Sequence, residues 1–214
     1  MTAERSEQPG SAANKPSRRN IPNYLVRELI DGIPFYYRGY RDVLNKTKTL
    51  EDLMSDSGLQ AILKDFIGDL LKANLDRKNW KVIPGEVGNH LSHRHNFGLD
   101  VTVFDKKVLT PDKITTKFIE VHATLVVEID VNVELPDPKS DLFQEYVVRK
   151  ILSLFSFGTQ KVIWIFTKSK MVISATPTVP WQFYNWQDDV ELMDGVLLNV
   201  GRYLAEEGIN PDIV

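Results

Sequence analysis

Hydrophobic positions along the chain follow two different periods, which predict different elements. Between Ser57 and Leu75 the apolar residues recur three and four positions apart, and this spacing predicts an amphipathic helix with Ser57 as its N-cap. Residues 24–30 and 33–37 instead alternate around the turn dipeptide Asp31-Gly32, which predicts a β-hairpin. Pro34 lies in the second strand and favours an edge position, because proline cannot donate to a strand ladder.

The remaining sequence alternates between apolar strand-like runs and two further helical patterns. A second helix is predicted from a cap at Ser140 to Phe157, with Gly158 ending it, and a last one from about Asp188 to Glu207. Residues 88–98 read as a loop. Strands are predicted at 80–87, 99–104, 118–133 (one or two strands), 161–166 and 171–174. This order predicts an α/β (α+β) domain with a mixed central β-sheet flanked by helices.

Composition narrows the class of protein. The chain has 214 residues, 43% of them hydrophobic, which suffices for one substantial core, so we expect a single domain over 21–214. Residues 1–20 are polar and charged without periodicity and predict a disordered leader. Since no run of eighteen apolar residues and no secretory pattern occurs, we expect a cytoplasmic protein without a membrane partner. The absence of cysteine excludes thiolate chemistry, and a net charge of −3 neither proposes nor excludes DNA as a partner.

Candidate chemistry begins with two acids in an apolar run. Glu128 and Asp130 are two residues apart within residues 124–131, and on a strand they would project from the same face. Two carboxylates beside a core are costly unless a positive group meets them, and a divalent metal ion would do so. Asp100, at the mouth of another strand-like run, is a third candidate ligand. The competing interpretation is a strand near the sheet edge with one solvated face.

Several short motifs follow one another in a distinctive order. They are Glu28-Leu29-Ile30-Asp31-Gly32, Asp100-Val101-Thr102-Val103, Leu125-Val126-Val127-Glu128-Ile129, Lys150, Gly158 and Val162-Ile163-Trp164. This order, with Lys150 eight residues before Gly158, resembles the Uma-two family of bacterial restriction-endonuclease-like proteins in the PD-(D/E)XK nuclease superfamily. The resemblance spans about residues 24–205 and implies a restriction-endonuclease-like fold.

The resemblance also implies roles for individual residues. Asp100, Glu128 and Lys150 would be catalytic in a DNA endonuclease, and Asp100 and Glu128 would bind Mg²⁺ or Mn²⁺, which promotes water attack on the phosphate. The residue pattern described above adds Asp130 as a third metal ligand. The chain departs from the family pattern at two positions. Leu99 replaces a proline, and Asp130 stands where the superfamily has a lysine and this family commonly has a small uncharged residue. Lys150, on the following helix, could supply the missing positive charge.

Two other interpretations remain open from the sequence. The chain could be a catalytically inactive protein that uses a nuclease fold for binding or as a scaffold. Histidines could instead form a transition-metal site with Glu86, because His93 and His95 are close in an extended segment and His90 and His122 are near in sequence. A homodimer is also possible, since a two-fold axis would let a nuclease cut both strands.

Overall fold

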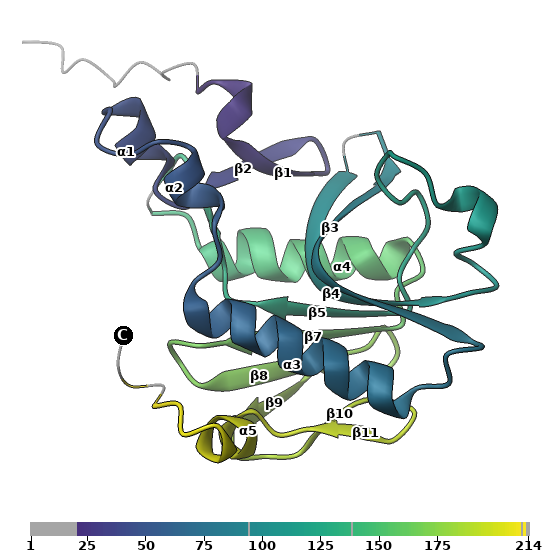
Figure 1. The fold of residues 1–214 in the computed structure, drawn as a ribbon. Helices are drawn as coiled ribbons and strands as arrows, with labels where there is room; N and C mark the ends of the chain where they lie inside the picture. The colour runs from purple at the N-terminus through teal and green to yellow at the C-terminus, as the bar shows by residue number, and fades with distance from the viewer. Residues whose placement is uncertain (1–20, 94, 138, 211, 213–214) are drawn as a thin grey trace, which may run out of the picture.

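One large β-sheet forms the centre of the computed structural model, which describes residues 21–93, 95–137, 139–210 and 212 (Figure 1). Its strands follow the order β6-β2-β1-β4-β5-β7-β8-β9, and β3 pairs with β4 outside this path. Only the β5–β7 pair is parallel among the described pairs. The strands are β1 (Val26–Ile30), β2 (Ile33–Tyr37), β3 (Trp80–Ser92), β4 (His95–Asp105), β5 (Leu125–Ile129), β6 (Val133–Glu134), β7 (Lys161–Phe166), β8 (Met171–Ala175) and β9 (Gln182–Asn185). The predicted fold class, a mixed sheet flanked by helices, is confirmed.

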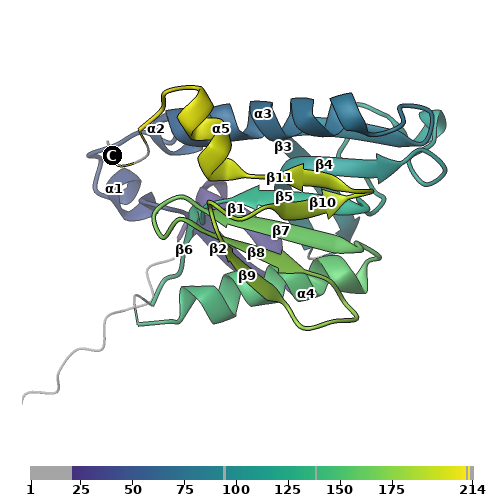
Figure 2. The same cartoon turned by 90° about the horizontal axis from the view of Figure 1, so that it is seen from below.

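Helices cover both faces of the sheet. Figure 2 shows α3 on one face and α4 on the other. Each buries an apolar stripe, so the sheet separates two hydrophobic cores. The α helices are α1 (Tyr40–Leu44), α2 (Glu51–Met54), α3 (Gly58–Asn74), α4 (Arg149–Ser156) and α5 (Val200–Glu206). Within the described residues, no helix is both long enough and apolar enough to cross a bilayer.

The two strongest local predictions are confirmed. The α3 helix starts at the predicted cap, where Ser57 Oγ accepts a hydrogen bond from the Gln60 backbone N–H at 3.2 Å. Strands β1 and β2 form the predicted hairpin, and Asp31 and Gly32 both have positive φ, as a type I′ turn requires. Pro34 pairs with Leu29 on one side, while β6 reaches only the far end of β2 and forms the sheet edge itself.

Two element predictions were wrong, at residues 88–98 and 188–207, and one between them was met by shorter strands than expected. Residues 88–92 and 95–98 belong to the paired strands β3 and β4 rather than to a loop. The pattern was obscured because the buried Phe97 and Leu99 lie between polar residues and glycine. Of the one or two strands predicted within 118–133 the structure has two short ones, β5 and β6, the second of which begins at Val133. The predicted helix over 188–207 is instead the hairpin β10 (Val190–Met193) and β11 (Val196–Leu198), followed by the short α5. Asp194 and Gly195 adopt positive φ and form a turn, which a continuous α-helix does not allow.

The helix before Gly158 covers nearly the predicted residues, but its N-cap and the geometry of its first turns differ from the prediction. Asp141, rather than Ser140, accepts hydrogen bonds from the first backbone N–H groups. Phe143–Val148 then forms a π-helical segment that runs directly into α4. Gly158, with φ of +112°, ends the helix as predicted. Because a π-helical turn contains an extra residue, it changes which side chains the helix directs at the sheet.

Candidate active site

A buried lysine is the centre of an ionic cluster between the sheet and α4. Lys150 is fully buried, and its Nζ lies 2.8 Å from Glu28 Oε1 and 2.9 Å from Glu128 Oε2. The ammonium group also donates to the Gly98 carbonyl at 3.0 Å. Strands β1, β4 and β5 and helix α4 each contribute a group, so the site depends on the tertiary fold.

Glu28 is a member of this cluster that the sequence analysis did not assign to the site. Its Oε1 accepts from the Gly98 backbone N–H at 3.0 Å, and its Oε2 accepts from the Tyr146 hydroxyl at 2.8 Å. Tyr146 comes from the π-helical segment one turn before Lys150. A signal was present in the sequence, because Glu28 shares the alternation of β1 with the buried Ile30 and so lies on an inward face.

Asp100 lies where strands β4 and β5 separate. Their pairing ends with Val101 opposite Val127, and β4 then contacts β1 through Asn96. Asp100 Oδ2 accepts from the Ile129 backbone N–H at 2.7 Å, which satisfies a donor that the ladder no longer reaches. Its other oxygen, Oδ1, is 2.7 Å from Lys64 Nζ of α3. Lys64 is a second residue that the sequence analysis missed.

The cluster contains more acids than cations. Glu28, Asp100 and Glu128 are three buried carboxyl groups, and Lys64 and Lys150 are the two buried ammonium groups. Burial disfavours the charged form of Lys150, but the nearby carboxylates of Glu128 and Glu28 outweigh it and raise its pKa well above the usual value. Lys150 therefore stays a cation near neutral pH and cannot act as a general base.

Glu128 is the acid whose protonation reduces the excess negative charge of the cluster. Burial raises its pKa to about 8, and the Asp100 and Glu28 charges act in the same direction against the opposing effect of Lys150. Its Oε1 is buried and has no hydrogen-bond partner among the described residues. A carboxyl oxygen left unsatisfied at such a place is able to accept a proton or a cation.

The donor set fits a hard divalent ion in a two-carboxylate site. The unpartnered Oε1 of Glu128 and the oxygens of Asp100 are of the kind that Mg²⁺ and Mn²⁺ prefer, and the two acids are close enough for their charges to interact. A set of three converging His, Cys, Asp or Glu side chains that could hold a metal is not found among the described residues. Most ligands of such an ion would therefore be water or substrate oxygens, as Mg²⁺ tolerates.

Asp130 does not join this group, contrary to the sequence prediction. Strand β5 ends at Ile129, and Asp130 adopts a left-handed φ of +61°, so the two-residue alternation no longer applies. Its carboxylate accepts from the backbone N–H of Thr167 at 2.7 Å and from the Thr167 hydroxyl at 2.6 Å. Its backbone carbonyl accepts from the Trp164 indole. Asp130 thus connects the end of β5 to the end of β7 through hydrogen bonds.

The histidines lie in separate environments. His90 Nδ1 is hydrogen-bonded to the Asn96 side chain, and His95 Nε2 is 3.4 Å from Asp31. Glu86 forms an ion pair with Arg27 instead of approaching either ring. In the part of the chain that the structure describes, no histidine-based metal cluster is present, so the transition-metal interpretation finds no support there.

A groove of about 530 Å³ is connected to the cluster through a chain of hydrogen bonds. Asn132 lines it and donates to Gln60 Oε1, and Gln60 in turn donates to the carbonyl of Ile129, whose N–H binds Asp100. Four cationic side chains line this groove, which we call the basic groove. They are Arg27, Arg38, Arg41 and Lys48.

The acids of the basic groove are already engaged. Asp42 pairs with Lys48, Glu134 pairs with Arg41, and Asp52 accepts from Thr49. Arg38 is exposed and forms no ion pair with any described acid. Its guanidinium group is therefore available to an anion in the groove.

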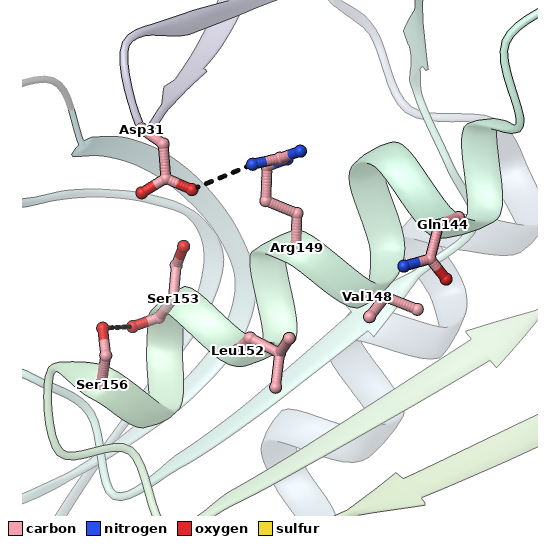
Figure 3. Close-up of a pocket in the computed structure, with 7 residues that line it drawn as sticks. All are labelled: Asp31, Gln144, Val148, Arg149, Leu152, Ser153 and Ser156. Carbon is pink, nitrogen blue, oxygen red and sulfur yellow. Dashed lines mark hydrogen bonds and ion pairs between the residues drawn. The ribbon is translucent and has the colours of Figure 1, made fainter.

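A second pocket, of about 360 Å³, lies on the outer side of α4 (Figure 3). Arg149 and Asp31 form an ion pair across it, and Gln144, Val148 and Leu152 extend along the helix. None of its lining residues belongs to the buried cluster. Lys150 and Arg149 are adjacent in sequence, but only Lys150 points into the sheet.

Comparisons with known proteins agree with the fold. A solved structure described as a "putative nuclease belonging to DUF820", from Anabaena variabilis ATCC 29413, matches with a TM-score of 0.58. The match covers 83% of this chain and 89% of that chain, at 13% sequence identity. No family model matches the sequence, and no curated protein matches it significantly. The chain therefore shares a nuclease-like fold with that protein, as the sequence resemblance implied.

The raised pKa of Glu128 predicts a pH-dependent stability. Between about pH 4.5 and 8 the unfolded chain releases this proton while the folded chain keeps it, so the free energy of unfolding should fall as pH rises. The slope contributed by one such group is on the order of 1 kcal/mol per pH unit. Urea unfolding in the presence of a chelator at several pH values measures it.

Glu128→Gln should remove this component of the slope, whereas replacement of the exposed Glu120 by Gln is the matched control and should leave it unchanged. Equal slopes for the wild type and Glu128→Gln would contradict the assignment of the buried proton to Glu128.

Proposed function

We propose that the protein is a metal-dependent endonuclease that hydrolyses phosphodiester bonds in DNA. The observation that supports this most directly is the buried, unpartnered Oε1 of Glu128 beside Asp100 and Lys150. An acid pair next to a fixed cation is the arrangement that phosphodiester hydrolysis uses, and the fold is shared with a protein described as a "putative nuclease". Mg²⁺ or Mn²⁺ is the proposed cofactor.

Asp100 and Glu128 are the residues that would hold the metal. A bound Mg²⁺ would supply positive charge for the phosphate and lower the pKa of a bound water. Asp100 is fixed in place by the Ile129 backbone N–H, and Glu128 is fixed through Oε2 by Lys150. Both carboxylates are thus oriented in advance, and Glu128 retains one free oxygen.

Lys150 acts in this proposal as a fixed cation and hydrogen-bond donor. Because its pKa is raised, it keeps its proton, and its charge can stabilise the negative charge that develops on the phosphate, while its three N–H groups hold Glu28, Glu128 and the Gly98 carbonyl. Glu28 is a positioning residue, because it holds the ammonium group through Oε1 while the Tyr146 hydroxyl and the Gly98 N–H hold Glu28 itself.

The basic groove is the proposed path of the DNA backbone. Hydrogen bonds link it to the cluster through Asn132, Gln60 and Ile129, and its volume of about 530 Å³ can accept part of a strand. Arginine recognises phosphate through charge and paired N–H donors, and Arg38 is free to do so.

A catalytically inactive binding protein is the second candidate. It is favoured by the two ion pairs that occupy the acids, Lys64 with Asp100 and Lys150 with Glu128, since such buried pairs can be purely structural. The position of Asp130 outside the site also favours the inactive binding protein. Metal binding separates the two candidates, because only the nuclease needs it.

Isosteric substitutions at the two acids should abolish metal binding and cleavage. Asp100→Asn and Glu128→Gln each remove a charged ligand, so we expect plasmid nicking with Mg²⁺ or Mn²⁺ to fall by about 100-fold or more, beyond the loss typical of outer-shell changes. Calorimetric titration with Mn²⁺ measures the binding directly.

Asp130→Asn is the matched control, because its carboxylate binds Thr167, and it should keep Mn²⁺ affinity and activity. Binding of DNA without any uptake of Mn²⁺ by the wild type would favour the inactive protein instead.

Removing the free arginine of the basic groove should weaken DNA binding. In a Glu128→Gln background, which prevents cleavage, Arg38→Ala should raise the Kd for a DNA duplex about 3- to 10-fold and lower the salt dependence by about one counterion. Fluorescence anisotropy over a range of salt concentrations measures both quantities.

Arg202→Ala is the control, because Arg202 lies on α5 and pairs with Asp189. If the two variants lose the same affinity, the groove has no special part in binding.

A further inference from the structure

Lys64 is an ammonium group shared between two carboxylates. It lies on α3, is only 4% exposed, and its Nζ is 2.7 Å from Asp100 Oδ1 and 2.8 Å from Asp56 Oδ2. Asp56 just precedes the helix and its side chain is 27% exposed. One of the two partners is therefore buried in the candidate active site, and the other lies at its rim.

The contact with Lys64 completes the hydrogen bonding of Asp100. Oδ1 is engaged by the ammonium group and Oδ2 by the Ile129 N–H. A divalent ion at Asp100 would stand close to the Lys64 charge, and two cations at one carboxylate repel each other. Metal binding therefore requires the ammonium group to withdraw, and the flexible lysine side chain already contacts a second carboxylate, that of Asp56.

We propose that Lys64 is a built-in competitor for the metal, which holds Asp100 in the metal-free protein and moves to Asp56 when the ion binds. The inference rests on the proposed function, since it concerns the same metal site. Lys64 is thus a positioning residue that sets metal affinity. If about one molecule in ten has Asp100 released, the apparent affinity for metal is about tenfold weaker than the intrinsic one.

Opposite effects of two substitutions test this proposal. In calorimetric titrations of the full-length protein with Mn²⁺, Lys64→Met should bind about tenfold tighter, because no ammonium group competes. Asp56→Asn should bind several-fold weaker, because Lys64 is left with Asp100 as its carboxylate partner. Lys72→Met is the matched control on the same helix, since Lys72 forms an exposed pair with Asp69, and it should bind as the wild type does.

A double-variant cycle separates competition from simple loss of negative charge near the site. If Asp56 acts through Lys64, Asp56→Asn should have no effect on Mn²⁺ affinity in the Lys64→Met background. A weakening that persists there would overturn the proposed exchange. Thermal unfolding gives a second readout, because Lys64→Met should lower the metal-free Tm and Mn²⁺ should raise it by more than in the wild type.

The outcomes distinguish this proposal from the proposed function. If Asp100→Asn abolishes Mn²⁺ binding while Lys64→Met and Asp56→Asn both bind as the wild type, the competitor role is overturned and the metal site stands. Binding by Lys64→Met but not by the wild type supports the competitor role. Absence of binding in both overturns both proposals. If Lys64→Met does not fold, wild-type affinity in Asp56→Asn overturns the competitor role and weaker affinity supports it.

Discussion

The buried ammonium group of Lys150 is the constraint on which the site depends. A charge with no exposure to solvent is tolerated only where several oxygens surround it, and these come from Glu28, Glu128 and the Gly98 carbonyl. Strands β1, β4 and β5 must therefore lie together opposite α4. Three features of the fold make this arrangement possible. They are the β1–β2 hairpin, the separation of β4 from β5, and the π-helical segment before Lys150.

The charge balance of the cluster connects stability to chemistry. Two buried ammonium groups face three carboxyl groups, and the remaining negative charge is avoided only when Glu128 keeps its proton. A divalent ion would take the place of that proton and would release it to solvent. The same excess of acid that weakens the metal-free protein at higher pH would thus favour a cation at the proposed metal site.

Sequence patterns predicted what depends on neighbouring residues and missed what depends on distant ones. The Ser57 cap and the Asp31-Gly32 turn act over a few residues, so their elements were found. Glu28 and Lys150 are 122 positions apart, and no periodicity links them. Lys64 was missed for the same reason, because a lysine near an apolar helix stripe usually extends to solvent. Asp130 was misplaced because the strand ended one residue too early for the alternation to hold.

The departure at Asp130 and the position of Lys150 have one physical explanation. The resemblance to PD-(D/E)XK nucleases places a lysine where this chain has Asp130, and a carboxylate there would add a further acid to a cluster already rich in them. The left-handed turn at Asp130 directs its carboxylate to Thr167, while Lys150 reaches Glu128 from α4. A cation from the helix leaves the end of β5 free to bind β7. In the proposed nuclease the positive charge would therefore come from α4 rather than from the end of β5, and the acids are next to Lys150.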